Sequence, residues 1–530
     1  MFLQEPNSGC HKTLLPKSNK RLNIRSNDPS DASKMMGRHD GQKAMFSYQV
    51  DLDRRVRATN PLRAIRAQVD FGWVRAEVAH CYGYNGNESV DPEVILKLLF
   101  LLFFDGVKSE RELMRIVPER LDYLWFLGYG LDDEIPDHSV LSKARARWGR
   151  EVFERLFVRT VAQCVALGLV DGKKIHADSS MVEANAAADS FVHTSPELVR
   201  AIREAYAVEE SKFEIDEERQ SHIPKSRTSF STTDPDASMA GKERQGGYAI
   251  AKPRYKSHRV VDERCAVITA VETTPGHIFD GACLVALTEQ HHRTTGIGAE
   301  TVVADQHYGT RENIRALQAQ GIRTHMQVIR ATGLTEKRGI FHASVFQYEP
   351  ATDTYRCPAK QTLIRRSYDR FQRGWLFRPD VKVCRACPLR AQCTTASIKT
   401  NSGRTIVHPD GYELVVRGCE QADSLEAKRD RRRRMTLMEG SFGQASQNHH
   451  FKRARWRRLW RQRIQDHLIA AVQNVKKIIK YGSPMLESAA KRLPPAPEPT
   501  YQGCFGLSRV FAALKNAIRR LLSDTMPCFS

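Results

Sequence analysis

The sequence predicts an α/β protein with a mixed β-sheet core, an all-helical domain before it and a cysteine-rich module inserted into it. Three observations support this fold class: strand-like runs that end on aspartate, helical periodicity near the start, and a break in that rhythm where four cysteines lie. The 530 residues suffice for two to four domains, and 41% hydrophobic residues supply at least one sizeable core.

The chain is strongly basic, with 82 Lys and Arg against 61 Asp and Glu, a net charge of +21 and a pI near 9.5. This balance favours a polyanionic partner, nucleic acid before membrane. The most apolar run, residues 94–104, is interrupted by Lys97 and is far shorter than the roughly 20 residues of a membrane span. No secretory signal precedes it, so we expect a cytosolic protein without a membrane partner. Twelve cysteines are too sparse for a disulfide scaffold.

The first third of the chain is predicted to be helical after a polar start. Residues 1–43 are basic and lack an apolar period, which predicts disorder, and residues 44–170 form the predicted helical domain. Its start signals include Asp91 followed by Pro92, and a capping box of Ser109 and Glu112. Short helices with a basic last member resemble helix-turn-helix DNA binders, although most such arrays are plain bundles. The basic residues of that member are Lys143, Arg145 and Arg147.

The sheet core is predicted to begin at residue 171 and to run to residue 333. A short strand follows the turn at Asp171 and ends on Asp178. At about 3.3 Å per residue the two acids lie ~20 Å apart, so only Asp178 can join a site at the strand's C-terminal end. After a helix over about 197–217, the polar stretch 219–247 is predicted to be a linker or loop.

Three more strands complete the predicted sheet. Residues 255–261 and 266–273 form a hairpin, a helix follows near 281–291, and a buried strand then delivers Asp305 to its C-terminal end. A helix capped by Thr310 and a strand near 323–329 come next. With the first three strands antiparallel and the Asp305 strand beside the first, this is the RNase H-like arrangement, in which two acidic strand ends meet.

Asp178 and Asp305 are therefore candidate ligands of one metal ion. Paired carboxylates without a neighbouring Cys or His favour a hard divalent cation such as Mg2+ or Mn2+. The alternative for Asp305 is that it only caps the following turn, which is the more common role of an Asp in this position.

Residues 334–430 break the strand and helix rhythm and are predicted to form an inserted module. Its candidate ligands are Cys357, Cys384, Cys387 and Cys393. A C-x2-C pair with two further thiols matches tetrahedral structural Zn2+ ligation, as in a zinc ribbon, and would stabilise a module with little core of its own. Four ordinary reduced cysteines are the alternative, because the outer pair is irregularly spaced.

Residues 431–482 are predicted to complete the core with an arginine-rich helical region that contains Glu439. Apolar residues recur there at helical spacing from Trp456 to Ile479. A dense run of cations with interleaved aromatic residues suits a phosphate backbone, although a solvated face is the more common role of a charged run. The candidate DNA-binding residues are Arg434, Lys452, Arg453, Arg455, Arg457 and Arg458. Residues 483–530 are predicted to be a stiff linker and a tail.

Together these motifs resemble bacterial insertion-sequence transposases of the DDE type. The resemblance covers about residues 46–482 and rests on five stretches. They are Ile135-Pro-Asp-His-Ser-Val, His176-Ala-Asp178, Val303-Ala-Asp305-Gln-His-Tyr-Gly, Cys387-Pro-Leu-Arg and Glu439-Gly-Ser-Phe-Gly. The resemblance implies an RNase H-like catalytic core in which Asp178, Asp305 and Glu439 form a catalytic triad that binds Mg2+ or Mn2+.

The resemblance also implies a function. Such an enzyme binds the terminal inverted repeats of an insertion sequence and catalyses metal-dependent cleavage and strand transfer of double-stranded DNA. We expect a homo-oligomer on DNA, because two ends must be joined, and a location on the chromosome in the bacterial cytoplasm. The alternatives are an RNase H-like nuclease without strand transfer and a catalytically inactive DNA-binding regulator.

One departure from the family pattern concerns the surroundings of Glu439. The family commonly places an Arg four residues before this Glu and a Lys seven after it, where this chain has Met435 and Ser446. Arg434 and Lys452 are the nearest basic residues that could stand in.

Overall fold

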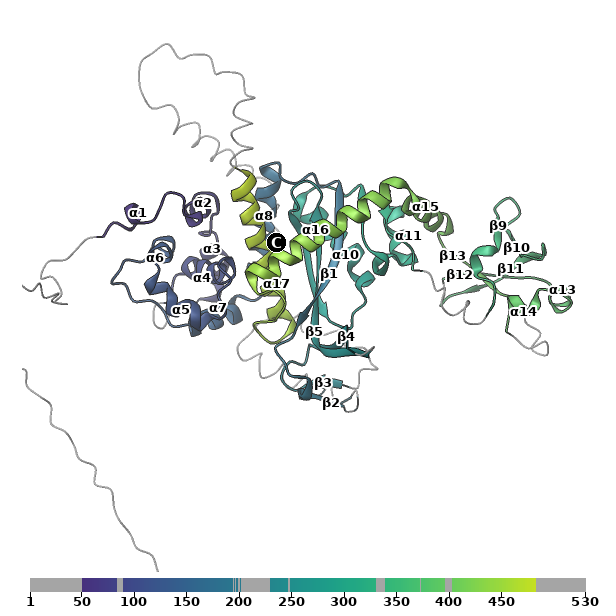
Figure 1. The fold of residues 1–530 in the computed structure, drawn as a ribbon, viewed down its shortest axis with the longest axis horizontal. Helices are drawn as coiled ribbons and strands as arrows, with labels where there is room; N and C mark the ends of the chain where they lie inside the picture. Colours follow the sequence, from purple (N-terminus) through teal and green to yellow (C-terminus); the bar gives the residue numbers. More distant parts are fainter. Residues whose placement is uncertain are drawn as a thin grey trace, which may run out of the picture. The chain divides into compact units, whose positions relative to one another are not determined.

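The computed structural model describes residues 50–82, 89–193, 229–245, 248–329, 339–371, 373–395 and 403–482, with a few isolated positions between 195 and 201. Figure 1 shows the arrangement of these residues in space. The predicted disordered start at 1–43, nearly all of the predicted helix at 197–217, and the linker and tail at 483–530 lie outside the described residues.

Helices form the described chain up to residue 166. Their bounds are α1 Leu52–Arg55, α2 Pro61–Gln68, α3 Val74–Val78, α4 Pro92–Phe104, α5 Glu110–Ile116, α6 Leu121–Leu127, α7 Ser139–Trp148 and α8 Glu151–Ala166. The expected N-caps are present: Asp91 accepts a hydrogen bond from the amide of Glu93, and Ser109 accepts one from the amide of Glu112. The nearly continuous apolar sequence of α4 is buried on all sides.

A mixed sheet of six strands follows, with the order β4-β5-β1-β7-β8 and β6 paired to β5. The bounds are β1 Lys174–Glu183, β4 Ser238–Gln245, β5 Tyr248–Asp262, β6 Ile268–Pro275, β7 Thr301–Val303 and β8 Arg323–His325. β5 is antiparallel to β1, β4 and β6, whereas β7 is parallel to β1 and to β8. The sheet thus has the predicted antiparallel first hairpin, and the strand before Asp305 lies beside the first strand.

The prediction of a linker or loop over residues 219–247 is wrong for its described part. That part contains β4 and the short strand β3 Ser229–Ser231, which pairs with β2 Phe191–His193. β4 pairs with β5 alone among the described strands. An edge strand of this kind needs no apolar alternation on both faces, so its polar sequence resembled a loop.

Helices cover both faces of the six-stranded sheet. Ile175 and Ala177 of β1 share an apolar core with α10 Leu284–Thr295 and α11 Arg311–Ala319. The intervening side chains of β1 face the other side, where α16 Leu425–His449 crosses the strand (Figure 1). The even-numbered residues of β1, Asp178 among them, therefore face α16.

The N-terminal helices and the last two helices share one apolar core. Buried side chains of α4, α8 and α17 Leu459–Lys477 belong to the same cluster. The contact is also polar: the ring of His449 donates to the carbonyl of Phe103 at 2.5 Å, and Lys476 Nζ donates to that of Phe104 at 3.1 Å. The predicted domain boundary at residue 170 is therefore not a boundary in packing.

The cysteine-rich module is a five-stranded antiparallel sheet of order β13-β12-β11-β10-β9. Its elements are β9 Gln347–Glu349, β10 Thr354–Arg356, β11 Thr362–Asp369, β12 Gly374–Arg378, α13 Val381–Arg385, α14 Arg390–Cys393 and β13 Ile406–Pro409. The module ends before the predicted residue 430, because α15 Tyr412–Asp423 packs against α11 and β8 of the main sheet and α16 starts at Leu425. Its buried core is small: Phe346, Tyr355, Leu363, Phe377 and Ile406.

Candidate active site

Asp178 and Asp305 lie at corresponding positions of two neighbouring parallel strands. The register pairs His176 with Val303, so each acid follows two residues after this last pair. Adjacent strands lie about 4.8 Å apart, which places both carboxylates at the same edge of the β1 and β7 pair. Burial raises the pKa of Asp178, and the negative charge of Asp305 adds to this shift, as expected of close like charges.

The prediction that Asp178 ends its strand is wrong. β1 continues to Glu183, because its residues stay paired with β5 on the other side, where Asp178 lies opposite Arg259. The parallel partner β7 ends earlier, at Val303. Asp178 therefore lies at the point where β7 leaves β1, and Asp305 belongs to the loop that leaves.

One cation holds the Asp178 carboxylate. Arg434 Nη1 donates to Oδ2 at 2.5 Å, and the amide of Ser179 donates to Oδ1 at 2.8 Å. The side chains of Arg434 and Asp178 are 12% and 27% exposed. Burial raises the pKa of Asp178 above its ordinary value, Arg434 lowers it and Asp305 raises it, with a net upward shift. A single arginine therefore compensates this carboxylate only in part.

Asp305 caps the short turn η5, Gln306–Tyr308. Its Oδ1 accepts a hydrogen bond from the amide of His307 at 2.9 Å. The capping role considered as the alternative is therefore present. It occupies one carboxylate oxygen, and among the described residues no ion pair joins Asp305 to a cation, so capping and metal binding are compatible at this residue.

Glu439 lies on α16, the helix that covers Asp178, but within the described residues it forms no hydrogen bond or ion pair with Asp178. Five residues separate it from Arg434, which at about 100° per residue turns it ~140° around the helix. The face toward the sheet is occupied by the buried Met438 and by Ser441, whose Oγ accepts from Arg259 Nη1 at 3.5 Å. Glu439 is exposed, and within the described part of the chain no hydrogen bond or ion pair links it to either aspartate.

The predicted DNA-binding residues of α7 divide by burial. Lys143 and Arg147 are exposed, whereas Arg145 is only 4% exposed. Arg145 pairs with Glu110, and its guanidinium lies 3.9 Å from the ring centroid of Trp456. These contacts lie on the buried face of α7, so the prediction that Arg145 binds DNA conflicts with its position.

The basic stretch after Glu439 is a loop between α16 and α17, which begins at Leu459, and not the predicted helix. The backbone leaves the helical region at His450 and Arg458, whose φ angles are 52° and 81°. Arg455 donates to the carbonyl of Lys108 at 2.7 Å, and burial lowers its pKa to about 10.

Arg458 pairs with Asp236 at 3.0 Å, and Lys452 Nζ donates to Ser180 Oγ at 2.7 Å. Arg455 and Arg458, both half-buried, therefore support packing, and the prediction that they bind DNA conflicts with these contacts. The exposed arginines of this loop are Arg453 and Arg457.

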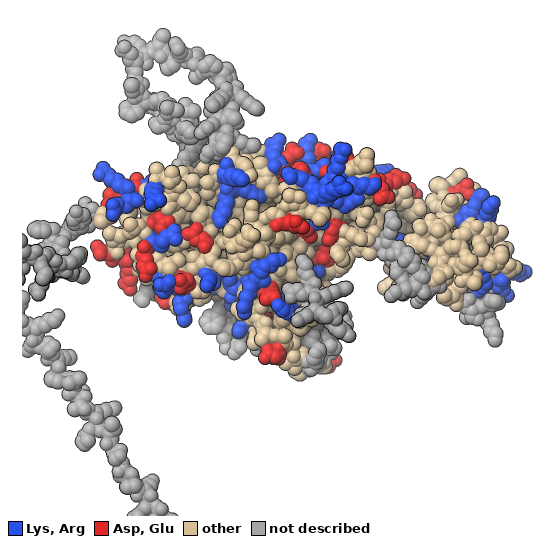
Figure 2. All heavy atoms as spheres, in the orientation of Figure 1, with Lys and Arg blue, Asp and Glu red and all other residues tan. Residues whose placement is uncertain are grey.

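Exposed cations also line the N-terminal half of α16, and the charged run predicted around Glu439 includes only the part of this surface that follows residue 430. The predicted boundary between residues 430 and 431 cut the charged run in two, although the run itself was the available signal. Figure 2 shows Lys and Arg side chains gathered over this part of α16. The exposed members are Lys428, Arg429, Arg432 and Arg433.

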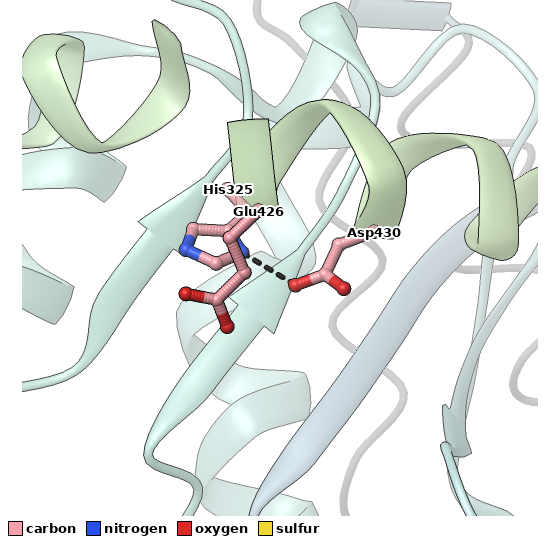
Figure 3. A group of neighbouring side chains, drawn as sticks. All are labelled: His325, Glu426 and Asp430. Carbon is pink, nitrogen blue, oxygen red and sulfur yellow. Dashed lines mark hydrogen bonds and ion pairs between the residues drawn. The ribbon is translucent and has the colours of Figure 1, made fainter. Parts of the chain in front are cut away.

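A second acidic cluster, which was missed, lies further toward the start of α16. We call His325, Glu426 and Asp430 the Asp430 group; their ligand atoms lie within 4.8 Å of one another (Figure 3). His325 Nδ1 and Asp430 Oδ2 are 2.7 Å apart. Lys174 Nζ lies 2.9 Å from Asp430 and 3.3 Å from Glu426. The lysine ammonium thus supplies the positive charge that a metal ion would bring, and the group is a closed polar network.

The four predicted zinc ligands lie around one pocket of the inserted module. Cys357, Cys384, Cys387 and Cys393 line it together with apolar side chains such as Phe346. Burial raises the pKa of Cys393, and the other three thiols raise it further. A Cβ at Gly403 would lie 3.0 Å from the sulfur of Cys384, so glycine permits this close approach. Among the described residues only the Asp430 group brings three ligand atoms within 4.8 Å, so the sulfurs are gathered but not closed around a point.

Two family models match the chain. A transposase domain (DUF772) covers residues 50–147, within the helical part, and a transposase DDE domain covers residues 356–479, from the cysteine module through α16 and α17. Glu439 lies in the second match, whereas Asp178 and Asp305 lie between the two.

Other comparisons add little. No curated protein matches the sequence. Among solved structures the chain is similar to a piggyBac transposase in a synaptic complex with hairpin DNA, at 11% identity, with 88% of this chain and 84% of that chain covered and a TM-score of 0.23. A score this low supports no argument about fold. None of the described helices is long and apolar enough to cross a membrane.

Proposed function

We propose that the chain is an insertion-sequence DDE transposase that binds the terminal inverted repeats of its element and catalyses metal-dependent cleavage and strand transfer of DNA, and the two matched transposase domains support this proposal. The observation that supports this most is the pair of carboxylates at corresponding positions of β1 and β7, covered by the helix that carries Glu439. The strand order agrees with an RNase H-like core, in which acidic residues meet at this edge of the sheet.

The donor set fits Mg2+ or Mn2+. Asp178 and Asp305 offer carboxylate oxygens, the ligands these cations prefer, and one arginine compensates their charge only in part. A bound divalent metal would activate the attacking hydroxyl and stabilise the leaving 3′ oxygen. Asp178 and Asp305 would hold it from the sheet, and Glu439 from α16.

Glu439 is available for this role but not yet in place. No hydrogen bond or ion pair among the described residues holds its carboxylate, so rotation about its side-chain bonds breaks no interaction. Met435, one turn earlier on the same face, is 53% exposed and cannot pair with it. The arginine nearest in sequence, Arg434, is already bound to Asp178. Arg434 therefore acts on the first acid in this chain and does not substitute for an arginine beside Glu439.

DNA contact would come from the exposed cations, because each phosphate neutralised by Lys or Arg releases counterions. The candidates that remain after the arginines with packing contacts are removed are Lys143, Arg147, Lys428, Arg429, Arg432, Arg433, Lys452, Arg453 and Arg457. Arg453→Ala combined with Arg457→Ala should weaken DNA affinity and flatten its salt dependence, and the half-buried Arg455 and Arg458 serve as controls.

A Zn2+ ion bound by the four cysteines would stabilise the inserted module. Its four cysteines share a pocket, and the module has few buried apolar side chains to stabilise it otherwise. We expect about one Zn2+ per chain by elemental analysis of freshly purified, reduced protein. Cys387→Ser should lower metal content and stability, while Cys283→Ser, a buried cysteine outside the module, should leave metal content unchanged. Folded wild-type protein that contains no metal would support the alternative that these are four ordinary reduced cysteines.

The function is tested with duplexes that carry the two ends of the DNA flanking the gene. Purified protein with Mg2+ or Mn2+ should nick at the repeat ends and join the freed 3′ ends to a second DNA, and both products are resolved on sequencing gels. Cleavage without joined product would support the nuclease alternative. Binding without cleavage in either metal would support the inactive regulator.

A further inference from the structure

The hairpin between β11 and β12 carries a phenylalanine that nothing in the protein covers. Phe371 is 97% exposed, more than any other large apolar side chain in the described residues. Its backbone is nevertheless held, because its amide donates to Asp369 Oδ1 at 2.8 Å. The exposed ring therefore belongs to a residue whose backbone is tied to the end of β11.

The base of this hairpin is anchored. The strands pair from Ile364 with Arg378 up to Asp369 with Gly374. A Cβ on Gly374 would lie 2.6 Å from the carbonyl oxygen of His408 in β13, so only glycine allows the two strands to approach this closely.

Two further contacts fix the tip. Tyr368 donates to Asp410 at 2.5 Å, and the amide of Asp410 donates to the carbonyl of Arg373 at 3.0 Å. Asp410, which directly follows β13, thus ties both strands of the hairpin to the module next to Phe371.

Cations surround the exposed ring. Arg370 and Arg373 flank Phe371 in sequence, Arg366 lies on β11, and all three are exposed. None of the three takes part in an ion pair within the described residues, whereas Arg365 on the same strand pairs with Asp353 at 3.1 Å. The hairpin thus presents one aromatic ring flanked by exposed arginines that form no ion pair among the described residues.

This chemistry fits nucleic acid better than protein. Protein-binding surfaces are usually contiguous apolar patches of several hundred Å2, and Phe371 stands among arginines. An aromatic ring between cations matches proteins that stack on an exposed base while arginines hold the neighbouring phosphates.

We propose that the hairpin tip, Arg370, Phe371 and Arg373, binds DNA at a position where a base is unpaired or unstacked, with the Phe371 ring stacked on that base. This inference rests on the proposed function, because strand cleavage and joining create such positions near the cut ends. The arginines contact the flanking phosphates, and the ring distinguishes distorted from regular duplex.

The test compares two 30-mer duplexes of the same sequence, one fully paired and one with three unpaired thymines. Affinities of the full chain are measured by fluorescence anisotropy for wild type, Phe371→Ala, Phe371→Leu and Phe371→Trp. We expect Ala and Leu to weaken binding to the bulged duplex about tenfold, the range of one lost base–aromatic stack, with little change on the paired duplex. Trp should retain the wild-type preference. Thermal unfolding should be unchanged in all variants, because the side chain is exposed.

The outcomes separate this inference from the proposed function. If Phe371→Leu binds the bulged duplex as wild type does, or if Ala weakens both duplexes equally, the stacking proposal is overturned while DNA binding stands. If wild type binds neither duplex, both proposals fail. If wild type binds DNA but does not cleave repeat ends, and Phe371→Ala loses affinity for the bulged duplex alone, the stacking proposal for Phe371 is supported and the enzymatic proposal is overturned.

Discussion

Two acidic groups lie along α16, and they differ in how their negative charge is compensated. The Asp430 group, near the start of the helix, is bound by Lys174, with Arg323 3.4 Å from Glu426. The second, which we call the Asp178 group, consists of Asp178, Asp305 and Glu439. Its one ion pair among the described residues is Arg434 with Asp178. Residues of both groups contact α16, and the cations that pair with them differ.

The pKa values of the two central acids shift in opposite directions. Burial alone would raise the pKa of Asp430, but hydrogen bonds from Lys174 and His325 bring it below its ordinary value. Burial also raises the pKa of Asp178, and there the single Arg434 does not reverse the shift. A lowered pKa marks a carboxylate whose ionised form is stabilised in the fold, whereas a raised pKa is a common feature of carboxylates at functional sites.

The largest expected effect is on chemistry and separates the two groups. Asp178→Asn keeps the side-chain shape but removes one metal-binding charge, so cleavage of repeat-end DNA should fall by orders of magnitude while DNA affinity stays near wild type. Asp305→Asn and Glu439→Gln should behave alike, measured by single-turnover cleavage and anisotropy.

Asp171→Asn is the matched control, since this residue precedes β1 and should leave cleavage intact. A Glu439→Gln protein that cuts at the wild-type rate would remove Glu439 from the Asp178 group.

The second-largest expected effect is a loss of stability, and it should appear in the Asp430 group. Asp430→Asn leaves Lys174 without its best partner in a partly buried position, so we expect a loss of about 1–3 kcal/mol in the free energy of unfolding. Urea denaturation measures it. Cleavage per folded molecule should stay near wild type. A stable Asp430→Asn protein that has lost cleavage would instead assign the Asp430 group to the active site.

The sequence predicted what local patterns determine. Apolar runs that end on Asp178 and Asp305 indicated two strands, and their pairing followed from the order of elements. The length of β1 was not predicted, because residues beyond Asp178 remain in the strand through pairing with β5, which a local pattern does not show.

The burial of individual arginines could not be predicted from local sequence patterns for the same reason. Arg145 and Arg458 look like surface cations in sequence, and only their distant partners Glu110 and Asp236 place them inside. The Asp430 group likewise joins His325 of β8 to two residues of α16. The predicted end of the module at residue 430 divided that helix. Contacts between residues far apart in the chain decide both cases.

A smaller effect should follow from removing Arg434, the cation that pairs with Asp178. Arg434→Gln takes a positive charge from the place where a metal ion would bind, so Mn2+ affinity measured by titration calorimetry should rise about fivefold to tenfold. Lys174→Gln makes the equivalent change at the Asp430 group. If it also creates a Mn2+ site, the two groups differ in their cations alone; if it does not, geometry also distinguishes them.

The smallest expected effect is on the pH dependence of stability, and it has opposite signs at the two acids. The pKa of Asp178 in the folded protein lies above the ordinary value of 3.8, so its ionised form destabilises the fold at neutral pH. Asp178→Asn should then be slightly more stable than wild type at pH 7, by less than about 1 kcal/mol, an effect common when active-site charges are removed. This gain should vanish as the pH falls through the Asp178 pKa and wild type becomes protonated.

Asp430 has a lowered pKa, so the stability it contributes is fully present above pH 3.8 and is lost only as the pH falls through its lower folded value. The deficit of Asp430→Asn should therefore persist through mild acid and close only in stronger acid. Denaturation of both variants and wild type between pH 7 and pH 3 measures the two differences. Parallel curves for the two variants would mean that the charges of the two acids are compensated alike, which would remove the electrostatic reason for locating the metal at Asp178.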